Sequence, residues 1–448
     1  MKKGIGILML LLTIATGSNG EVLVKNPVNP RYFAHAGSSE AVYLTGSHTW
    51  NLIVTDDPDM PTYEAMERYL DWVQSFGHNY IRLWTNRSYN THTPVPWNLI
   101  DGDAVMDEKW NEDYFNYLAE RVNQVTSRGM YCSVMLFGSG VGFKDDWQGG
   151  TYWHPDYNTS AALDAAFSAT DGDSFYTSNT AAFEVQKALI RKTIDTLNDE
   201  DRIFWEVINE PNLPASATWH NTIMAYIREF EAAKPKQHLI MMSGEGAAPS
   251  TSDEQYLFKS NADIISPDNL SPYSITQGGN ASYSSKIIMN DTDHITGYSD
   301  PDDAVIYRKW VWRAFCRGTN VIFMDSYDDN IPPYNDGYIN PVFDPVRAAM
   351  GHTKRYADRM DLRYALPSTS FSSTGYALVH PGRTYLIYQP DTGSFTYSLP
   401  PGYYNYEWFN PNTGIVTATG TMKGAKKLKS TPPYGSVDAV LFIEPKSP

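Results

Sequence analysis

The chain has 448 residues and a formal net charge of −16, with 35 Lys and Arg residues against 51 Asp and Glu residues. This acidic balance excludes a nucleic-acid partner from our expectations, because the composition offers no basic stripe to neutralise phosphates. The two cysteines, Cys132 and Cys316, lie in apolar stretches, which favours two buried free thiols over a disulfide. The length exceeds that of one typical domain, and we expect two.

The first 20 residues, MKKGIGILMLLLTIATGSNG, combine two lysines, an apolar run and small residues at Ser18 and Gly20. This pattern predicts a secretory signal peptide over residues 1–20 that is removed near Gly20. The apolar run is too short to span a bilayer, and no later window approaches about 20 uninterrupted apolar residues. We therefore expect a secreted or periplasmic protein without a membrane partner.

Short apolar runs alternate with helical patterns from about residue 42 to residue 350, which is typical of repeated βα units around a parallel sheet. Two helical patterns, 62–77 and 111–129, each end on a glycine that suits a helix C-cap. An open doubly wound sheet is the alternative, but no Gly-rich fingerprint follows the first strand. We predict a (β/α)8 TIM barrel over residues 21–360. Its strands are expected at 41–46, 79–84, 130–138, 202–210, 238–245, 262–268, 286–291 and 320–327.

The pattern changes from about Arg363, where apolar and polar residues alternate and the turn sequences PDTG and NPNTG separate the runs. This alternation predicts a small antiparallel β-sandwich domain over residues 361–448. Such a domain would either bind carbohydrate or brace the barrel, and we favour bracing.

Aromatic residues are frequent, with 12 Trp and 31 Tyr. Their flat apolar faces and polar edges suit stacking on sugars. The segment 138–179 is too long for an ordinary βα loop, so we expect a lid or a subsite wall there. Its candidate sugar contacts are Trp147, Tyr152, Trp153 and His154, with packing inside the protein as an equally weighted alternative for each.

The run WEVINEPN, residues 205–212, indicates a buried strand that ends in a carboxylate-bearing turn. Barrel enzymes keep their chemistry at C-terminal strand ends, and Pro211 would fix the backbone that holds Glu210 there. An exposed loop acid is the alternative interpretation of this tripeptide alone. Glycoside hydrolysis needs two carboxylates, one protonated as the acid and one ionised as nucleophile or base. The possible partners of Glu210 are the acids at other predicted strand ends: Glu245, Asp268, Asp291, Asp293 and Asp325.

The order of these motifs resembles clan A of the glycoside hydrolases, the cellulase-like (β/α)8 enzymes, with Arg82 near the end of the second strand and Asn209-Glu210-Pro211 ending the fourth. The resemblance implies that Glu210 is the acid/base, that Asn209 hydrogen-bonds the sugar 2-OH, and that the nucleophile ends the seventh strand, at Asp291. The run 29–51 further resembles secreted bacterial members that include apiosidase-like enzymes. The run EWFNPNTG (407–414) resembles a sandwich domain with a collagen-binding label that often accompanies them.

The sequence departs from the clan at two strand ends. Asp291 stands where the clan usually has Glu, which withdraws the carboxylate by about one C–C bond, roughly 1.5 Å. Retention needs the two carboxyl groups ~5–5.5 Å apart, so Asp293 and Glu245 stay open as alternatives to Asp291. Met324-Asp325 replaces the usual Trp of the eighth strand, and the predicted sugar platform is therefore Trp50 and Trp84. The full set of candidate substrate contacts is Asn209, Arg82, His48, Trp50, Trp84, Trp147, Trp153, Glu245, Asp325 and Tyr327.

Two of these residues have alternative roles. Arg82 would support the nucleophile at the barrel mouth, which we favour, or pair with Glu206 inside the barrel. His48 would contact substrate or serve as a structural histidine. No HExxH or other ligand spacing predicts a metal, and we expect no cofactor.

The sequence thus predicts a secreted, retaining glycoside hydrolase that acts on a plant or algal polysaccharide or on its oligosaccharides. A barrel that binds carbohydrate without turnover is the alternative, kept open by the missing seventh-strand Glu. A lyase is a weaker interpretation, since no Tyr/His/Lys constellation of suitable spacing is present.

Overall fold

The computed structural model of the chain describes residues 22–48, 52–53, 62–85, 94–100, 103–106, 109–138, 152–153, 157–160, 178, 181–209, 216–244, 253–267, 286–291, 301–325, 341–435 and 437–446. The expected signal peptide, residues 1–20, lies outside them. Within these ranges no helix has the length and apolar character needed to cross a membrane.

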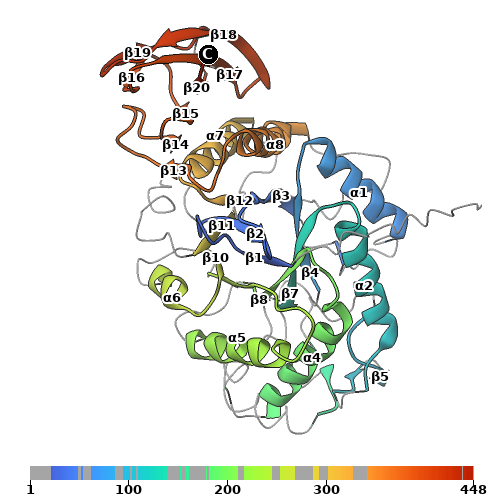
Figure 1. Cartoon of the computed structure of the whole chain (residues 1–448). Helices are drawn as coiled ribbons and strands as arrows, with labels where there is room; N and C mark the ends of the chain where they lie inside the picture. Colours follow the sequence, from blue (N-terminus) through green and yellow to red (C-terminus); the bar gives the residue numbers. More distant parts are fainter. Residues whose placement is uncertain are drawn as a thin grey trace, which may run out of the picture.

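Eight parallel strands form the centre of the molecule, and helices surround them (Figure 1). The strand order in the sheet is β3-β12-β11-β10-β9-β8-β7-β4, so the last barrel strand, β12, lies beside the first, β3. This arrangement confirms the predicted (β/α)8 barrel. The strands are β3 (Thr45–His48), β4 (Tyr80–Trp84), β7 (Tyr131–Phe137), β8 (Ile203–Ile208), β9 (Ile240–Ser243), β10 (Ile264–Ser266), β11 (Ile287–Asp291) and β12 (Asn320–Met324).

The first barrel strand begins later than the predicted 41–46. Ahead of Thr45, the backbone does not bond to the backbone of the neighbouring barrel strands. Val42 pairs with Phe33 of the N-terminal segment, Asn79 Nδ2 donates to the carbonyl of Tyr43, and the Leu44 N–H donates to Asn320 Oδ1. The strand therefore ends at His48, which brings this residue into the sheet. Gly46 lies where β3 approaches β4, and a Cβ there would meet the Tyr80 carbonyl at 1.8 Å, so only glycine fits.

The helices confirm the predicted alternation of strand and helix. The predicted helices at 62–77 and 111–129 are α1 and α2, and they are followed by Gly77 and Gly129, whose φ angles are 86° and 76°. Both helices start with a side-chain cap, since Thr62 Oγ1 accepts from the Ala65 N–H at 3.1 Å and Asn111 caps α2 in the same way. The helices are α1 (Tyr63–Ser75), α2 (Glu112–Thr126), α4 (Ala181–Leu197), α5 (Ala217–Glu231), α6 (Asp253–Lys259), α7 (Pro301–Cys316) and α8 (Asp344–Arg359).

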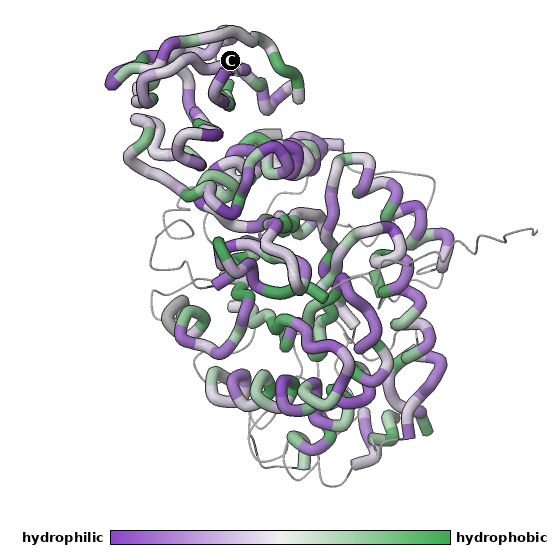
Figure 2. The backbone as a smooth tube through the Cα atoms, in the orientation of Figure 1, coloured by the Kyte–Doolittle hydropathy of each residue, from purple (hydrophilic) through white to green (hydrophobic). Residues whose placement is uncertain are grey.

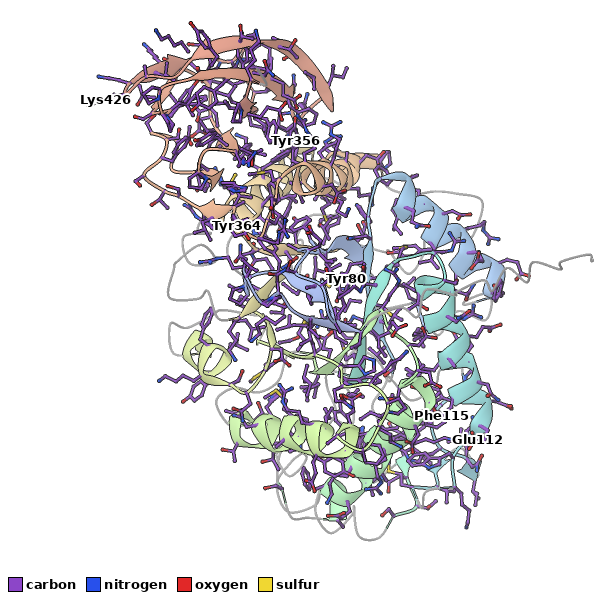
Figure 3. All side chains as sticks on the ribbon, in the orientation of Figure 1. Tyr80, Glu112, Phe115, Tyr356, Tyr364 and Lys426 are labelled. Carbon is purple, nitrogen blue, oxygen red and sulfur yellow. The ribbon has the colours of Figure 1, made fainter. Side chains whose placement is uncertain are left out.

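The N-terminal half of the barrel interior is apolar, as the hydrophobic colour of the central strands in Figure 2 indicates. Tyr80, labelled at the barrel centre in Figure 3, stacks on Phe204 with ring centroids 5.6 Å apart. A hairpin of β1 (Leu23–Lys25) and β2 (Phe33–His35) adds Leu23 and Phe33 to this cluster. Because this apolar cluster fills the N-terminal end of the interior, polar side chains gather at the C-terminal end of the barrel.

An antiparallel domain follows α8 and confirms the predicted sandwich. Its larger sheet has the order β13 (Leu366–Pro367), β14 (Ala377–His380), β15 (Thr384–Gln389), β20 (Ala439–Pro445), β17 (Tyr403–Asn410) and β18 (Ile415–Lys423). A second small sheet pairs β16 (Phe395–Tyr397) with β19 (Leu428–Ser430). One face of the large sheet packs on this pair, and the other packs on α7 and α8.

The barrel and the C-terminal domain share one apolar core. Trp312 of α7 packs on Tyr388 and Phe409, and Tyr356 of α8, labelled in Figure 3, contacts Phe409 and Phe442. Both cysteines, Cys132 and Cys316, are buried and free, as expected.

Candidate active site

Polar side chains occupy the C-terminal end of the barrel interior. They come from six different strands or strand ends, and all are buried. Because the carboxyl ends of parallel strands meet at one edge of the barrel, these groups lie close together. They are His48 of β3, Arg82 of β4, Ser133 of β7, Glu206 of β8, Ser243 of β9 and Asp291 of β11.

Arg82 is the hub of this layer. Its Nε donates to both oxygens of Glu206, at 2.9 and 3.0 Å, and its Nη1 donates to Asp291 Oδ2 at 2.9 Å. Its Nη2 donates to Asn209 Oδ1 at 2.6 Å. One planar guanidinium thereby joins the ends of three strands, because its five N–H donors have a fixed geometry. Arg82 makes the predicted pair with Glu206 and also contacts Asp291, and its support of a nucleophile stays a prediction.

Glu206 has no exposed surface, and it accepts hydrogen bonds from three side chains. Besides Arg82, Ser133 Oγ donates to it at 3.1 Å and Ser243 Oγ at 2.8 Å. Tyr80 supports Ser133 by donating its hydroxyl at 2.7 Å. A buried carboxylate is tolerated where a cation and further hydrogen bonds compensate for lost water. Glu206 therefore fixes Arg82 from below.

Asp291 is the last residue of β11 and is 2% exposed. Its carboxylate accepts from Arg82 and lies 3.3 Å from His48 Nε2. Among the described residues of this layer, Arg82 contacts two carboxylates, Glu206 and Asp291, and His48 is the second basic side chain. His48 Nδ1 has no hydrogen-bond partner in the described part of the chain. Arg82 thus gives this strand-end carboxylate a positive neighbour and a hydrogen bond.

Asn209 directly follows β8 and is 4% exposed. Strict alternation would put Glu206 and Asn209 on opposite faces, because they are an odd number of residues apart. Both nevertheless contact Arg82, so the chain leaves the regular pleat after Ile208. The strand end thereby brings the amide of the NEP sequence to the centre of the polar layer.

A family model described as Cellulase (glycosyl hydrolase family 5) matches residues 37–308, which is more than half of the chain. The chain belongs to glycoside hydrolase family 5. This membership makes the protein a glycosidase whose substrate is a carbohydrate, and it confirms the resemblance to the cellulase-like clan. A search of curated proteins finds no match.

Solved structures of similar fold cover most of this family 5 member. One, described as a glycoside hydrolase, is 14% identical with a TM-score of 0.65, over 96% of this chain and 98% of that one. A family 5 glycoside hydrolase from Bacteroides vulgatus is 14% identical with a TM-score of 0.66, over 95% and 94%. An endo-1,4-β-mannanase from Rhizomucor miehei is 14% identical with a TM-score of 0.50, over 76% and 100%. At these identities the likeness concerns the fold alone.

Two tryptophans predicted to contact sugar in this family 5 glycosidase, Trp84 and Trp153, are buried. Trp84 is 5% exposed, and its ring lies under the Arg82 guanidinium, with 5.3 Å between the guanidinium carbon and the ring centroid. Trp153 is 1% exposed and packs edge-on against Trp97, and its neighbour Tyr152 is also buried. The packing alternative fits Trp153 and Tyr152 better than sugar stacking does, because a core position buries more apolar surface.

Asp325, a predicted substrate contact, is fully buried after β12. Both of its oxygens accept from Arg347 of α8, at 2.7 and 2.5 Å. A bidentate pair of this kind engages the whole carboxylate. This pair links strand and helix, and a sugar contact of Asp325 stays a prediction.

Eight of the candidate site residues lie outside the described residues, including the expected acid/base. They are Glu210, Asp293, Glu245, Asp268, Tyr327, Trp50, Trp147 and His154. Among the residues that are described, no group of three or more His, Cys, Asp or Glu side chains could hold a metal ion. Sequence reasoning missed Ser133 and Ser243, although single serines at the inward positions of apolar strands are a signal for such a layer.

Proposed function

We propose that the protein is a secreted, retaining glycoside hydrolase that acts on a plant or algal polysaccharide or its oligosaccharides. Glu210 is the acid/base and Asp291 the nucleophile. The observation that carries this proposal is the bridge made by Arg82, which bonds Asn209, the neighbour of Glu210, and Asp291 with one guanidinium. Such a bridge relates the two strand ends that must flank the scissile bond.

The reaction has two steps. In the first, the Asp291 carboxylate attacks the anomeric carbon, the glycosidic C–O bond breaks, and Glu210 gives its proton to the leaving oxygen. In the second, Glu210 takes a proton from water, whose oxygen attacks the same carbon and releases Asp291. Each step inverts the anomeric carbon, so the product keeps the configuration of the substrate.

The contacts of Asp291 support the nucleophile role. Arg82 Nη1 donates to Oδ2, and His48 Nε2 lies 3.3 Å from Oδ2 and 3.4 Å from Oδ1. The Arg82 donor on this short side chain restricts its rotamers, and a fixed nucleophile needs less reorganisation in the transition state.

The proposal is tested by the configuration of the first product. The purified protein is screened for released reducing ends on plant and algal polysaccharides, with β-1,4-mannan included because one protein of similar fold is a mannanase. Proton NMR of the first-formed sugar should then show the retained anomer. Initial appearance of the inverted anomer would contradict the nucleophile assignment, because a gap of ~6.5–9.5 Å between the carboxyl groups admits a water instead.

A further inference from the structure

The C-terminal domain reverses the charge of the chain locally. The segment 395–430 contains four lysines, Lys423, Lys426, Lys427 and Lys429, but only one acidic residue, Glu407, whereas the chain as a whole carries −16. All four lysines are exposed, and none pairs with a carboxylate within the described residues. Lys426, labelled in Figure 3, lies at the outer tip of this domain. Since charges are screened beyond about 10 Å at 0.1 M salt, the local balance decides what binds there.

One tyrosine is exposed between two lysines at this end of the large sheet. Tyr403, the first residue of β17, is 65% exposed and lies directly opposite Lys423 of β18. On its other side β20 continues the ladder, because Tyr404 pairs with Pro445 and the Lys446 N–H donates to the Tyr403 carbonyl at 2.9 Å. Lys446 therefore lies opposite Tyr403. Opposed residues on antiparallel strands point to the same face, with Cβ atoms about 5 Å apart.

The next row on the same face is polar and uncharged apart from one acid. Asn405 lies opposite Thr421 on one side and Glu444 on the other. All three line a groove of about 390 Å³ between the sheet and Arg359 at the end of α8. The two rows are about 7 Å apart, the length of two strand residues. We call these six residues, Tyr403, Lys423, Lys446, Asn405, Thr421 and Glu444, the Tyr403 surface.

We propose that the Tyr403 surface is an accessory binding site for an acidic polysaccharide, a chain with uronate units. The Tyr403 ring offers a flat apolar face for the C–H side of a sugar. Lys423 and Lys446 flank that ring and bind the carboxylate of the stacked unit, while Asn405, Thr421 and Glu444 bind hydroxyls of the next one. The inference goes beyond hydrolysis in the barrel and does not depend on it.

The chemistry of the Tyr403 surface distinguishes this ligand from a neutral glycan. A neutral chain would receive only hydrogen bonds to its hydroxyls from these lysines, whereas a uronate would also pair its negative charge with them, which offsets more of the lost rotamer freedom. A nucleic acid would be attracted by any group of lysines and would respond equally to all of them. Position, not only number, of the lysines is therefore the property to test.

The test is affinity electrophoresis of the full chain in gels that contain polygalacturonate, neutral galactomannan or single-stranded DNA. Polygalacturonate should retard the protein, and the two other polymers should not. Tyr403→Ala should weaken the affinity about tenfold, the usual effect of removing a central aromatic contact. Tyr364→Ala, which removes another exposed tyrosine of the same domain, should leave the affinity unchanged.

A matched pair of double variants tests position against charge. K423Q/K446Q removes the two lysines beside Tyr403, and K426Q/K427Q removes two lysines from the neighbouring turn, so both change the net charge equally. Only K423Q/K446Q should abolish retardation. Equal loss in both variants, equal binding of DNA, or no retardation by polygalacturonate would each overturn the proposal. Reducing-end release from a neutral substrate should be unaffected by all four variants, which separates this result from a failure of the barrel chemistry.

Discussion

Two buried arginines of this protein differ in the number of carboxylates that they bind. They are Arg82 in the barrel and Arg308 at the domain junction. Arg308 donates to one carboxylate, Asp438, and to the Asn412 side chain at 2.7 Å. Tyr388 completes this group by donating its hydroxyl to Asp438 at 2.9 Å. Arg82 donates to two carboxylates, Glu206 and Asp291. Both arginines are 2% exposed, so burial alone does not distinguish them.

The difference teaches how a structural ion pair and a reactive one are told apart. A buried pair with matched charges is satisfied within the fold and gains nothing from a ligand. Two carboxylates on one guanidinium leave negative charge at a strand end of the barrel, where positive charge develops on a sugar during glycoside cleavage. Asp291 stands in that position, whereas Asp438 joins β20 to α7. The predictions below break or sharpen this contrast.

Asp291→Ala is expected to have the largest effect. It should lower turnover by about a thousandfold or more, because the nucleophile is lost. The fold should survive, since the variant leaves Arg82 and Glu206 as a matched pair like that of Arg308. Turnover and urea unfolding measure the two effects, and azide should partly restore turnover by forming a glycosyl azide. If Asp293→Ala is inactive instead and Asp291→Ala is active, the nucleophile assignment is wrong.

Glu210→Gln should act on the other half of the mechanism. General acid catalysis contributes roughly 10²–10⁴-fold, and this contribution is needed most when the leaving group is poor. The variant should therefore lose most activity on natural glycosides and much less on aryl glycosides with activated leaving groups. Rates on both substrate types provide the measurement. An equal loss on the two types would exclude the acid role.

Asp438→Asn and Glu206→Gln compare the two arginines directly. Asp438→Asn leaves Arg308 without a carboxylate and should cost about 3–5 kcal/mol of stability, with turnover per folded molecule unchanged. Glu206→Gln leaves Arg82 with Asp291, so it should cost less stability. It should instead lower turnover, by about tenfold or more, because the guanidinium that positions Asp291 loses its anchor.

Urea unfolding and turnover of both variants provide the test. The control is Glu407→Gln, which removes a partly exposed carboxylate from Arg359 and Tyr356 at the same junction. Its effect on stability should be smaller than that of Asp438→Asn, because exposed pairs contribute little. Similar losses of turnover in Glu206→Gln and Asp438→Asn would remove the distinction between the two arginines.

The sequence predicted the barrel, the antiparallel domain and the strand end at Asp291, because each depends on a local pattern of apolar and turn residues. It did not predict which polar groups meet. Glu206 and Asn209 both bond to Arg82, although strict alternation would place them on opposite faces of the strand. Asp325 bonds to Arg347, which lies in the α8 helix. Such contacts depend on packing between distant segments, which no periodicity encodes. The roles of the candidate catalytic carboxylates remain predictions.

His78 gives the smallest expected effect, a dependence of stability on pH. It lies between β3 and α8, where Nδ1 accepts from the Ser47 N–H at 3.2 Å and Nε2 donates to the Arg347 carbonyl at 2.9 Å. Burial lowers the pKa of His78 from 6.5 to about 4. As the pH falls, His78 is therefore protonated near pH 6.5 in the unfolded chain but only near pH 4 in the folded chain. The stability that the neutral ring contributes is complete above pH 6.5 and is lost as the pH falls.

Within that window the loss due to His78 amounts to about 1.4 kcal/mol per pH unit. Urea unfolding of the wild type and of His78→Gln, from about pH 7 to about pH 4.5, isolates this contribution because other titrating groups are common to both proteins. Glutamine can keep one of the two hydrogen bonds but does not titrate, so the variant should start less stable and lose stability less steeply on acidification. Parallel curves for the two proteins would mean that His78 takes up its proton without unfolding, and that the neutral link between the first barrel strand and α8 does not exist.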